Sequence, residues 1–179
     1  TATSPGYGRF WPDEDIAPFV EHLWTVAWDL ETPTVSEVLA HPSVQLVVER
    51  DASAVAGVFT GRFVRRLEGR GRVLGVKFRP GGFRPFVRGP VSELTDRRRT
   101  LPEVFGAEAL DFEARVLTAV ELEDAFAEVQ VFLRAQRPVA GETIDLVGRI
   151  VERAATDREV TRVAHLVEAF DIAPRRLQR

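Results

Sequence analysis

The first 90 residues alternate hydrophobic and polar positions in the way that is typical of β-strands. In residues 19–30, every second side chain from His22 to Trp28 falls on one face of an extended chain. Similar runs predict further strands within 43–51, 54–69 and 71–83. Glycine and proline separate these short strands, which favours a β-sandwich or a small barrel. Before residue 19, five glycines and prolines favour an irregular lead-in.

From about residue 90 the hydrophobic period changes to that of helices. Residues 90–106 predict short helices or turns, with Thr100 as the cap of one of them. Apolar residues recur at steps of three and four through 109–138, which predicts a long amphipathic helix, and 141–159 predicts another with Thr143 as its cap. The fold class expected is therefore α+β.

Three parts follow from this order of elements. Residues 1–90 form a β-rich domain, 91–138 a helical segment that packs on it, and 142–179 a helical tail. Proline and glycine between 138 and 142 mark the linker before the tail.

The tail, VTRVAHLVEAFDIAPRRLQR (160–179), predicts two helices joined by a tight corner. Thr161 is a suitable cap for the first helix, and Asp171 occupies the position where that helix must end. Ile172 follows as an apolar plug between the helices. Pro174 is favoured at the first position of the second helix.

The second helix of this tail carries side chains that suit DNA. Arginine and glutamine match the edges of guanine and adenine in the major groove, and a helix-turn-helix places them in the first turns of its second helix. The expected DNA-binding residues are Arg175, Gln178 and Arg179 on the outward face, with Arg176 beside them. The alternative is an ordinary helical hairpin with a solvated basic end.

Composition narrows the class of protein. The chain has 179 residues, 45% of them hydrophobic, and contains no cysteine, which excludes disulfides and cysteine-ligated metals. No apolar run reaches the length of a membrane span and no signal peptide is visible, so we expect no membrane partner and a cytoplasmic location.

Charge is distributed unevenly along the chain. Residues 60–100 hold twelve basic and three acidic side chains, whereas 101–148 hold three basic and ten acidic ones. Two interpretations are open. The basic segment contacts phosphates, or Arg97, Arg98 and Arg99 pair with the acidic helix predicted at 109–138.

Candidate chemistry in the front domain is limited to a binding pocket. Histidines are not clustered and no nucleophile motif is present, so we expect no metal, no cofactor and no catalytic residue. Aromatic side chains are the best candidates for lining a small-molecule pocket: Trp24, Trp28, Phe59 and Phe78.

The chain resembles AraC-type transcriptional regulators. The tail is similar to their first helix-turn-helix, with LQR (177–179) after Pro-Arg-Arg as its most specific part, although Asp171 and Ala173 replace the usual glycine and serine. In the front part, FRPGGF followed by ELTDR is the best match to one subgroup. The resemblance implies a cupin-like barrel that senses a small-molecule effector, a helical segment that forms a homodimer, and base contacts from the outward residues of the second tail helix.

The family's DNA-binding domain has two helix-turn-helix units, and this chain holds most of the first one only. The resemblance thus implies a sequence-specific transcriptional regulator, not an enzyme, whose chain is cut within its first helix-turn-helix. The alternative is a cupin-like domain that binds or converts a small molecule and has an incidental helical tail.

Overall fold

The computed structural model describes residues 3–38 and 41–177, which divide into two compact units at Ala140. The first unit, residues 1–140, is mixed α+β, with an antiparallel sheet followed by helices. Its strands are β1 (Thr3–Phe10), β2 (Val20–Val38), β3 (Gln45–Glu49), β4 (Ala54–Ala56), β5 (Phe63–Phe78) and β6 (Arg98–Arg99). They form one six-stranded sheet in the order β1-β2-β5-β3-β4-β6.

Three differences from the sequence prediction concern the strands. Residues 3–10 pair with β2 and are not irregular, because that strand offers an edge to which a glycine- and proline-containing segment can add. β2 continues to Val38, eight residues past its predicted end. β5 runs without a break through Gly69 and Gly71, where the prediction separated two strands.

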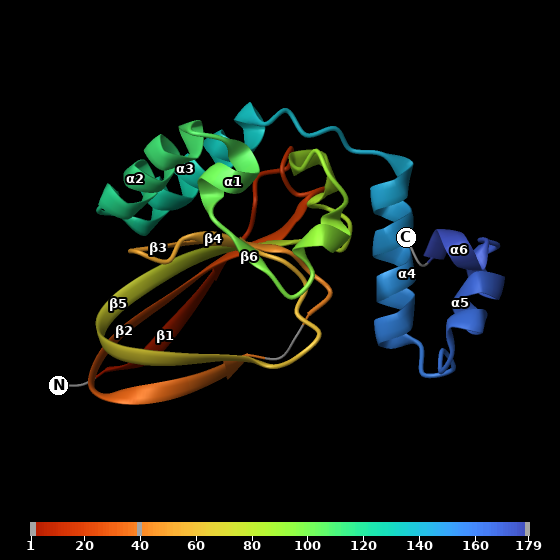
Figure 1. Cartoon of the computed structure of the whole chain (residues 1–179), viewed down its shortest axis with the longest axis horizontal. Helices are drawn as coiled ribbons and strands as arrows, with labels where there is room; N and C mark the ends of the chain where they lie inside the picture. The colour runs from red at the N-terminus through yellow and green to blue at the C-terminus, as the bar shows by residue number, and fades with distance from the viewer. Residues whose placement is uncertain (1–2, 39–40, 178–179) are drawn as a thin grey trace. The chain divides into compact units, whose positions relative to one another are not determined.

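The long strands β2 and β5 bend, and this bend gives the sheet its curvature (Figure 1). Their register shifts between Leu30 and Thr34, and Gly69 opposite has a φ of 58°, a value that suits glycine. Beyond the bend, Leu67 packs with Trp28 and Val47 of the same sheet. One face of the sheet is therefore concave.

The other face is covered by α1 (Leu101–Phe105), α2 (Glu108–Thr118) and α3 (Leu122–Ala135), as Figure 1 shows. Two 3₁₀ helices, Arg84–Phe86 and Val91–Leu94, precede them. The core between helices and sheet includes side chains that are at most 2% exposed: Leu23, Leu46, Val48, Val55, Leu74, Val76 and Phe112. Burial of these apolar groups is the main stabilising term of the first unit.

The long helix predicted at 109–138 is two helices. α2 ends at Thr118, whose hydroxyl donates to the Ala114 carbonyl, and α3 begins at Leu122 after an extended Glu121. The turn lets Phe112 stack on Phe132 with ring centroids 4.0 Å apart. Apolar spacing continues through Val120, which is 84% exposed, so periodicity alone did not reveal the reversal.

Thr100 precedes α1 as predicted. Its backbone N–H and its hydroxyl both donate to Glu103 Oε2, at 2.7 and 2.8 Å. These bonds hold the pKa of Glu103 below its usual value. The arginines before Thr100 do not pair with the predicted acidic helix in the described part of the chain: Arg98 donates to the Ala52 carbonyl and Arg99 pairs with Glu103.

The second unit, from Gly141 on, is helical: α4 (Glu142–Thr156), α5 (Val163–Phe170) and α6 (Pro174–Leu177). Its two expected caps are shifted, since Gly141 and Arg162 precede the helices in place of Thr143 and Thr161. Ile150 and Ile172 are the buried apolar residues of this unit among those described. Throughout 3–38 and 41–177, no helix has the length and apolarity required to cross a membrane.

Candidate binding site on the concave face of the sheet

Two tryptophans lie flat on glycines across the concave face of the sheet. Trp24 pairs with Gly75 and Trp28 with Gly71 in the β2–β5 register. A Cβ atom added to Gly75 would lie 2.1 Å from Trp24 Cε2, and one added to Gly71 would lie 2.3 Å from Trp28 Cζ2. Each indole thus occupies the space that a side chain opposite would fill, and glycine is required at both positions.

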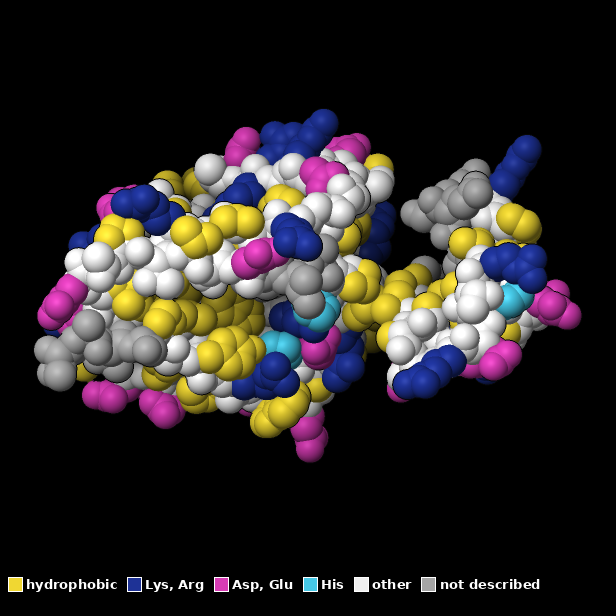
Figure 2. Space-filling view, turned by 90° about the horizontal axis from the view of Figure 1, so that it is seen from below, with side chains coloured by type: hydrophobic (Ala, Val, Ile, Leu, Met, Phe, Trp, Pro, Cys, Tyr) yellow, Lys and Arg dark blue, Asp and Glu magenta, His cyan; other side chains and the backbone are white. Residues whose placement is uncertain are grey.

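A cavity of about 120 Å³ opens beside Trp24 on this face, and we call it the small cavity. Hydrophobic side chains gather in a hollow on the side of the first unit opposite its helices (Figure 2). The apolar wall of the small cavity includes Trp24, Val47, Phe59 and Phe63, and the rings of the two phenylalanines are 5.6 Å apart. Gln45 lies at the same wall and accepts a hydrogen bond from Trp24 Nε1 at 3.1 Å.

Two guanidinium groups also line the small cavity. Arg65 bonds the carboxylate of Glu49 and lies 5.6 Å from the Trp28 ring. Arg98 donates to the Ala52 carbonyl at 2.9 Å and lies 6.0 Å from the Phe63 ring. The cavity therefore joins an aromatic wall to paired cations.

Glu49 is the acid whose charge acts on Arg98. Burial lowers the pKa of the Arg98 guanidinium, the positive charge of Arg65 lowers it further, and Glu49 opposes both. Arg98 as a residue is exposed, so its guanidinium stays charged. Two positive charges therefore face one negative charge, and the small cavity has a surplus of one.

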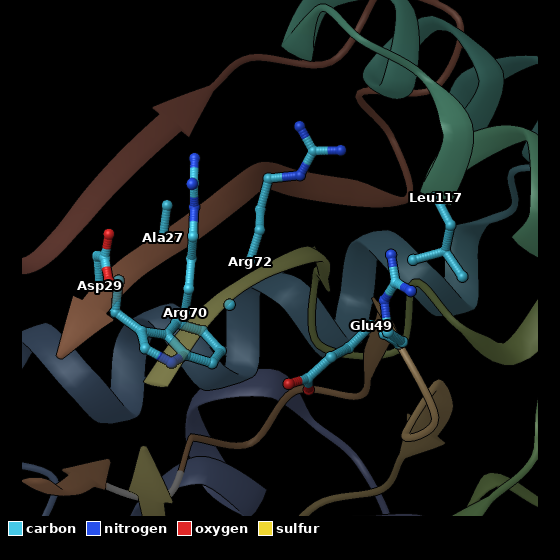
Figure 3. A pocket seen from close by; sticks show the side chains of 9 residues that line it. Ala27, Asp29, Glu49, Arg70, Arg72 and Leu117 are labelled. Carbon is cyan, nitrogen blue, oxygen red and sulfur yellow. The ribbon is translucent and has the colours of Figure 1, made fainter. Parts of the chain in front are cut away.

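Glu49 also borders a second, larger cavity of about 780 Å³. Figure 3 shows the side chains of Arg70 and Arg72 leaving β5 on the same side, whereas the carboxylate of Glu49 points away from them. Arg72 also donates to the Ala119 carbonyl at 3.2 Å. Glu49 is 7% exposed, and no donor among the described residues reaches its Oε2. Each member of the Glu49–Arg65 pair thus lines a different cavity, Glu49 the larger one and Arg65 the small one.

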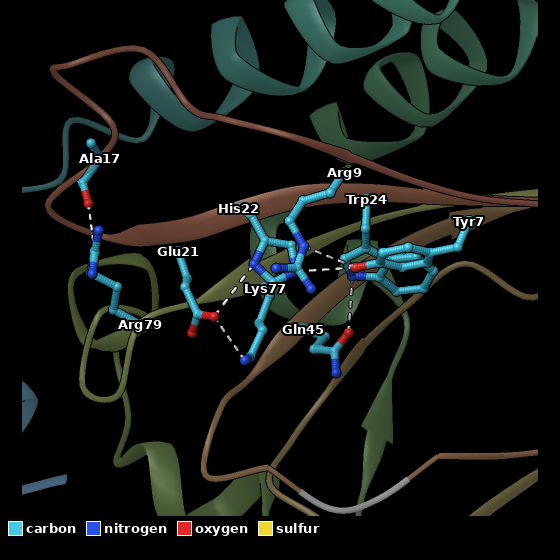
Figure 4. Close-up of polar contacts among 9 residues, drawn as sticks. All are labelled: Tyr7, Arg9, Ala17, Glu21, His22, Trp24, Gln45, Lys77 and Arg79. Atoms are coloured by element: carbon cyan, nitrogen blue, oxygen red, sulfur yellow. Dashed lines mark hydrogen bonds and ion pairs between the residues drawn. The ribbon is translucent and has the colours of Figure 1, made fainter. Parts of the chain in front are cut away.

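A row of polar side chains crosses the end of the concave face beside the small cavity (Figure 4). Tyr7 Oη lies 3.4 Å from His22 Nε2, and His22 Nδ1 lies 3.4 Å from Glu21 Oε1 without the geometry of a hydrogen bond. Lys77 Nζ donates to Glu21 Oε1 at 2.9 Å. Burial first, and then the charges of Arg9 and Lys77, lower the pKa of His22, so its imidazole is neutral at pH 7.

The four aromatic residues expected in a pocket fall into three places. Trp24 and Phe59 line the small cavity, and Trp28 lines the larger one. Phe78 lines neither, because it is fully buried against Phe83 with ring centroids 4.9 Å apart. Sequence reasoning missed Arg65, Arg98 and Gln45. The alternation of glycine opposite tryptophan is the signal that identifies this face.

Within the described residues, no group of three or more histidines, cysteines or acids could hold a metal ion.

The corner of the tail lies in the second unit. Asp171 has φ 48° and ψ 48°, the left-handed conformation in which glycine is favoured. The Ile172 N–H donates to the Val167 carbonyl at 3.2 Å and the Asp171 N–H to the Glu168 carbonyl at 3.4 Å, which is the Schellman pattern. Ile172, 8% exposed, is buried as an apolar plug.

Of the four expected DNA-binding residues, Arg175 is exposed in the first turn of α6. Arg176 lies in the same turn, and its side chain is outside the described part. Gln178 and Arg179 lie outside the described residues altogether.

Comparisons with known proteins place the first unit only. No curated protein and no protein of solved structure is significantly similar to the chain. The family model described as a domain of unknown function, DUF6597, matches residues 8–100, which span β2 to β6 and the last three residues of β1 and include every residue that lines the small cavity. This match extends over more than half of the chain. The chain therefore belongs to the DUF6597 family.

Proposed function

We propose that this chain is the sensory unit and the first DNA-contacting element of an AraC-type transcriptional regulator. In this proposal the first unit is a cupin-like sensor that binds a small-molecule effector without converting it. The second unit is a helix-turn-helix element that contacts a specific DNA sequence.

The observation that carries the DNA-binding proposal is the corner between α5 and α6. A left-handed Asp171, a buried Ile172 and Pro174 at the start of α6 set the second helix at a fixed turn from the first. Arg175 is exposed at the amino end of that helix, where free backbone N–H groups also favour phosphate.

The sensory role is supported by the small cavity. It is lined by apolar side chains and a few polar groups, which is the usual composition of a ligand site. We also propose a homodimer formed through the helical segment, because Leu110 of α2 and Val131 of α3 are 55% and 53% exposed.

The test is selection of bound sequences from random duplexes by the full-length gene product. We expect a defined operator, and we expect Arg175→Ala to relax preference at one or two base pairs by about 1–3 kcal/mol. A matched control is Arg158→Ala, which removes an exposed arginine outside the helices of the same unit and should leave the preference unchanged.

Two results would reject this function. One is the absence of any selected sequence, and the other is an equal effect of the two substitutions. A protein that binds small molecules and no duplex would favour the alternative, a binding domain with an incidental helical tail.

A further inference from the structure

The small cavity has more hydrogen-bond donors than the protein uses. A guanidinium has five N–H donors, and the described bonds use one from Arg65, to Glu49, and one from Arg98, to the Ala52 carbonyl. Donors therefore remain on both arginines of a cavity that they line together. A bound group with acceptor oxygens would accept hydrogen bonds from these N–H groups.

The charges around the small cavity indicate which class of ligand it favours. One carboxylate, that of Glu49, faces two guanidinium groups, so the cavity favours a ligand that brings one negative charge. Arginine matches the planar geometry of a carboxylate. Glu49 is buried and lines the larger cavity, and only its Oε1 accepts from Arg65 among the described bonds, so Glu49 does not occupy the small cavity.

The apolar residues that line the cavity determine which body the ligand can have. Trp24, Phe59 and Phe63 present aromatic rings, and Val47 and Ala56 present aliphatic groups. A volume of about 120 Å³ is below the range of cavities that hold drug-sized ligands, so it accepts a small body.

We propose that the small cavity binds a small monocarboxylate with an apolar body, whose carboxylate contacts Arg65 and Arg98 and whose body packs on Trp24, Phe59 and Phe63. This inference rests on the sensory role proposed for the first unit and names the chemical class of its ligand. It separates this ligand from sugars and other neutral polyols, which would leave the surplus charge uncompensated.

Isothermal titration of the full chain at pH 7 tests the proposal with two carboxylates, phenylacetate and hexanoate. Phenylacetamide has the same body without the charge, and acetate has the charge without the body. We expect at least one of the two larger carboxylates to bind about tenfold or more tightly than either control. The tighter of the two tells whether the cavity fits a ring or a chain.

Variants locate the binding. Arg98→Gln should lower the affinity for the tighter-binding carboxylate about tenfold or more. Arg98→Lys keeps the charge but loses the planar guanidinium, so its affinity should lie between that of Arg98→Gln and that of the unaltered protein. Arg97→Gln is the matched control, because Arg97 is an exposed neighbour that does not line the cavity, and it should bind normally.

The proposal is overturned if phenylacetamide or acetate binds as tightly as the larger carboxylates, if neither carboxylate binds by about 1 mM, or if Arg97→Gln and Arg98→Gln behave alike. The comparison of ligands on the unaltered protein remains decisive if Arg98→Gln does not fold. Duplex selection is scored separately, so carboxylate binding without an operator rejects the regulator, and an operator without carboxylate binding rejects this inference alone.

Discussion

The two faces of the sheet differ in what their side chains do. The face under α1–α3 is apolar, and its central residues are at most 2% exposed. The concave face carries indoles laid on glycines, a buried carboxylate and the small cavity. The helix-covered face therefore stabilises the unit through close packing. The concave face instead has an open cavity and one positive charge without a counter-charge, which suits a ligand.

The largest effect is expected on the helix-covered face. Phe112→Ala should lower the free energy of unfolding of the first unit by about 3–5 kcal/mol, since Phe112 is fully buried and stacks on Phe132. Urea unfolding followed by tryptophan fluorescence measures this unit, because all three tryptophans lie in it. Asp111→Ala in the same helix, at an exposed residue outside the proposed dimer contact, should cost under about 1 kcal/mol. Equal costs would contradict the assignment of this face as the stabilising one.

On the concave face, the largest effect should come from the ion pair. Arg65→Met leaves Glu49 buried without its partner and should cost about 2–3 kcal/mol, less than for a fully buried pair because the Arg65 side chain is 28% exposed. Adding Glu49→Gln should recover most of the loss, because the uncompensated charge is then gone. Arg66→Met breaks a pair whose side chains are both 68% exposed and should change the stability by about 0–1 kcal/mol. The same urea titration compares the three variants, and a double variant no more stable than Arg65→Met would reject the explanation.

The sequence predicted the covered face better than the concave one. Strand alternation and helical period depend on local burial, so they found β2, β3 and the helical part. Trp24, Trp28 and Phe59, predicted from their aromatic side chains to line an effector pocket, line cavities, and their binding of an effector stays a prediction. The sequence patterns misplaced Phe78, because an apolar residue in a strand has the same appearance whether it lines a cavity or fills a core.

Long-range pairing could not be predicted in the same way. Arg65 and Glu49 come together because β5 bends back over the sheet, and Arg98 joins them from β6. The extent of that bend depends on a register shift between Leu30 and Thr34, which no local pattern indicates. The glycines at 71 and 75 were visible in the sequence, but their role follows only from their partners across the sheet.

A third prediction tests the tryptophan–glycine contacts. Gly75→Ala should destabilise the first unit by about 1–3 kcal/mol, because its Cβ would lie 2.1 Å from the Trp24 indole, which must then move. We also expect a shift in tryptophan emission. Gly61→Ala is the control, since nothing lies within 4 Å of a Cβ there, and it should leave both emission and stability close to those of the unaltered chain. An emission shift of the same size in both variants would show that the indole does not depend on this glycine.

The smallest effect concerns pH and the end of the concave face. Burial and the charges of Arg9 and Lys77 lower the pKa of His22 in the folded state, while Glu21 opposes them. The unfolded chain therefore takes up the proton first, and stability that is present above about pH 6.5 should be lost as the pH falls below it, with a slope of at most about 1.4 kcal/mol per pH unit. Once the pH is below the folded pKa, this loss should stop.

Urea titrations at pH 7.5, 6.5 and 5.5 (roughly one unit on either side of the ordinary histidine pKa) measure this slope. His22→Gln cannot take up the proton, so its stability should change less over this range than that of the unaltered chain. His41→Gln removes an exposed histidine beside the small cavity and should keep the slope. If the pH dependence of stability disappears in His41→Gln and persists in His22→Gln, the neutral imidazole of the concave face is not its source. The contrast between the two faces would then depend on the ion pair and the glycines alone.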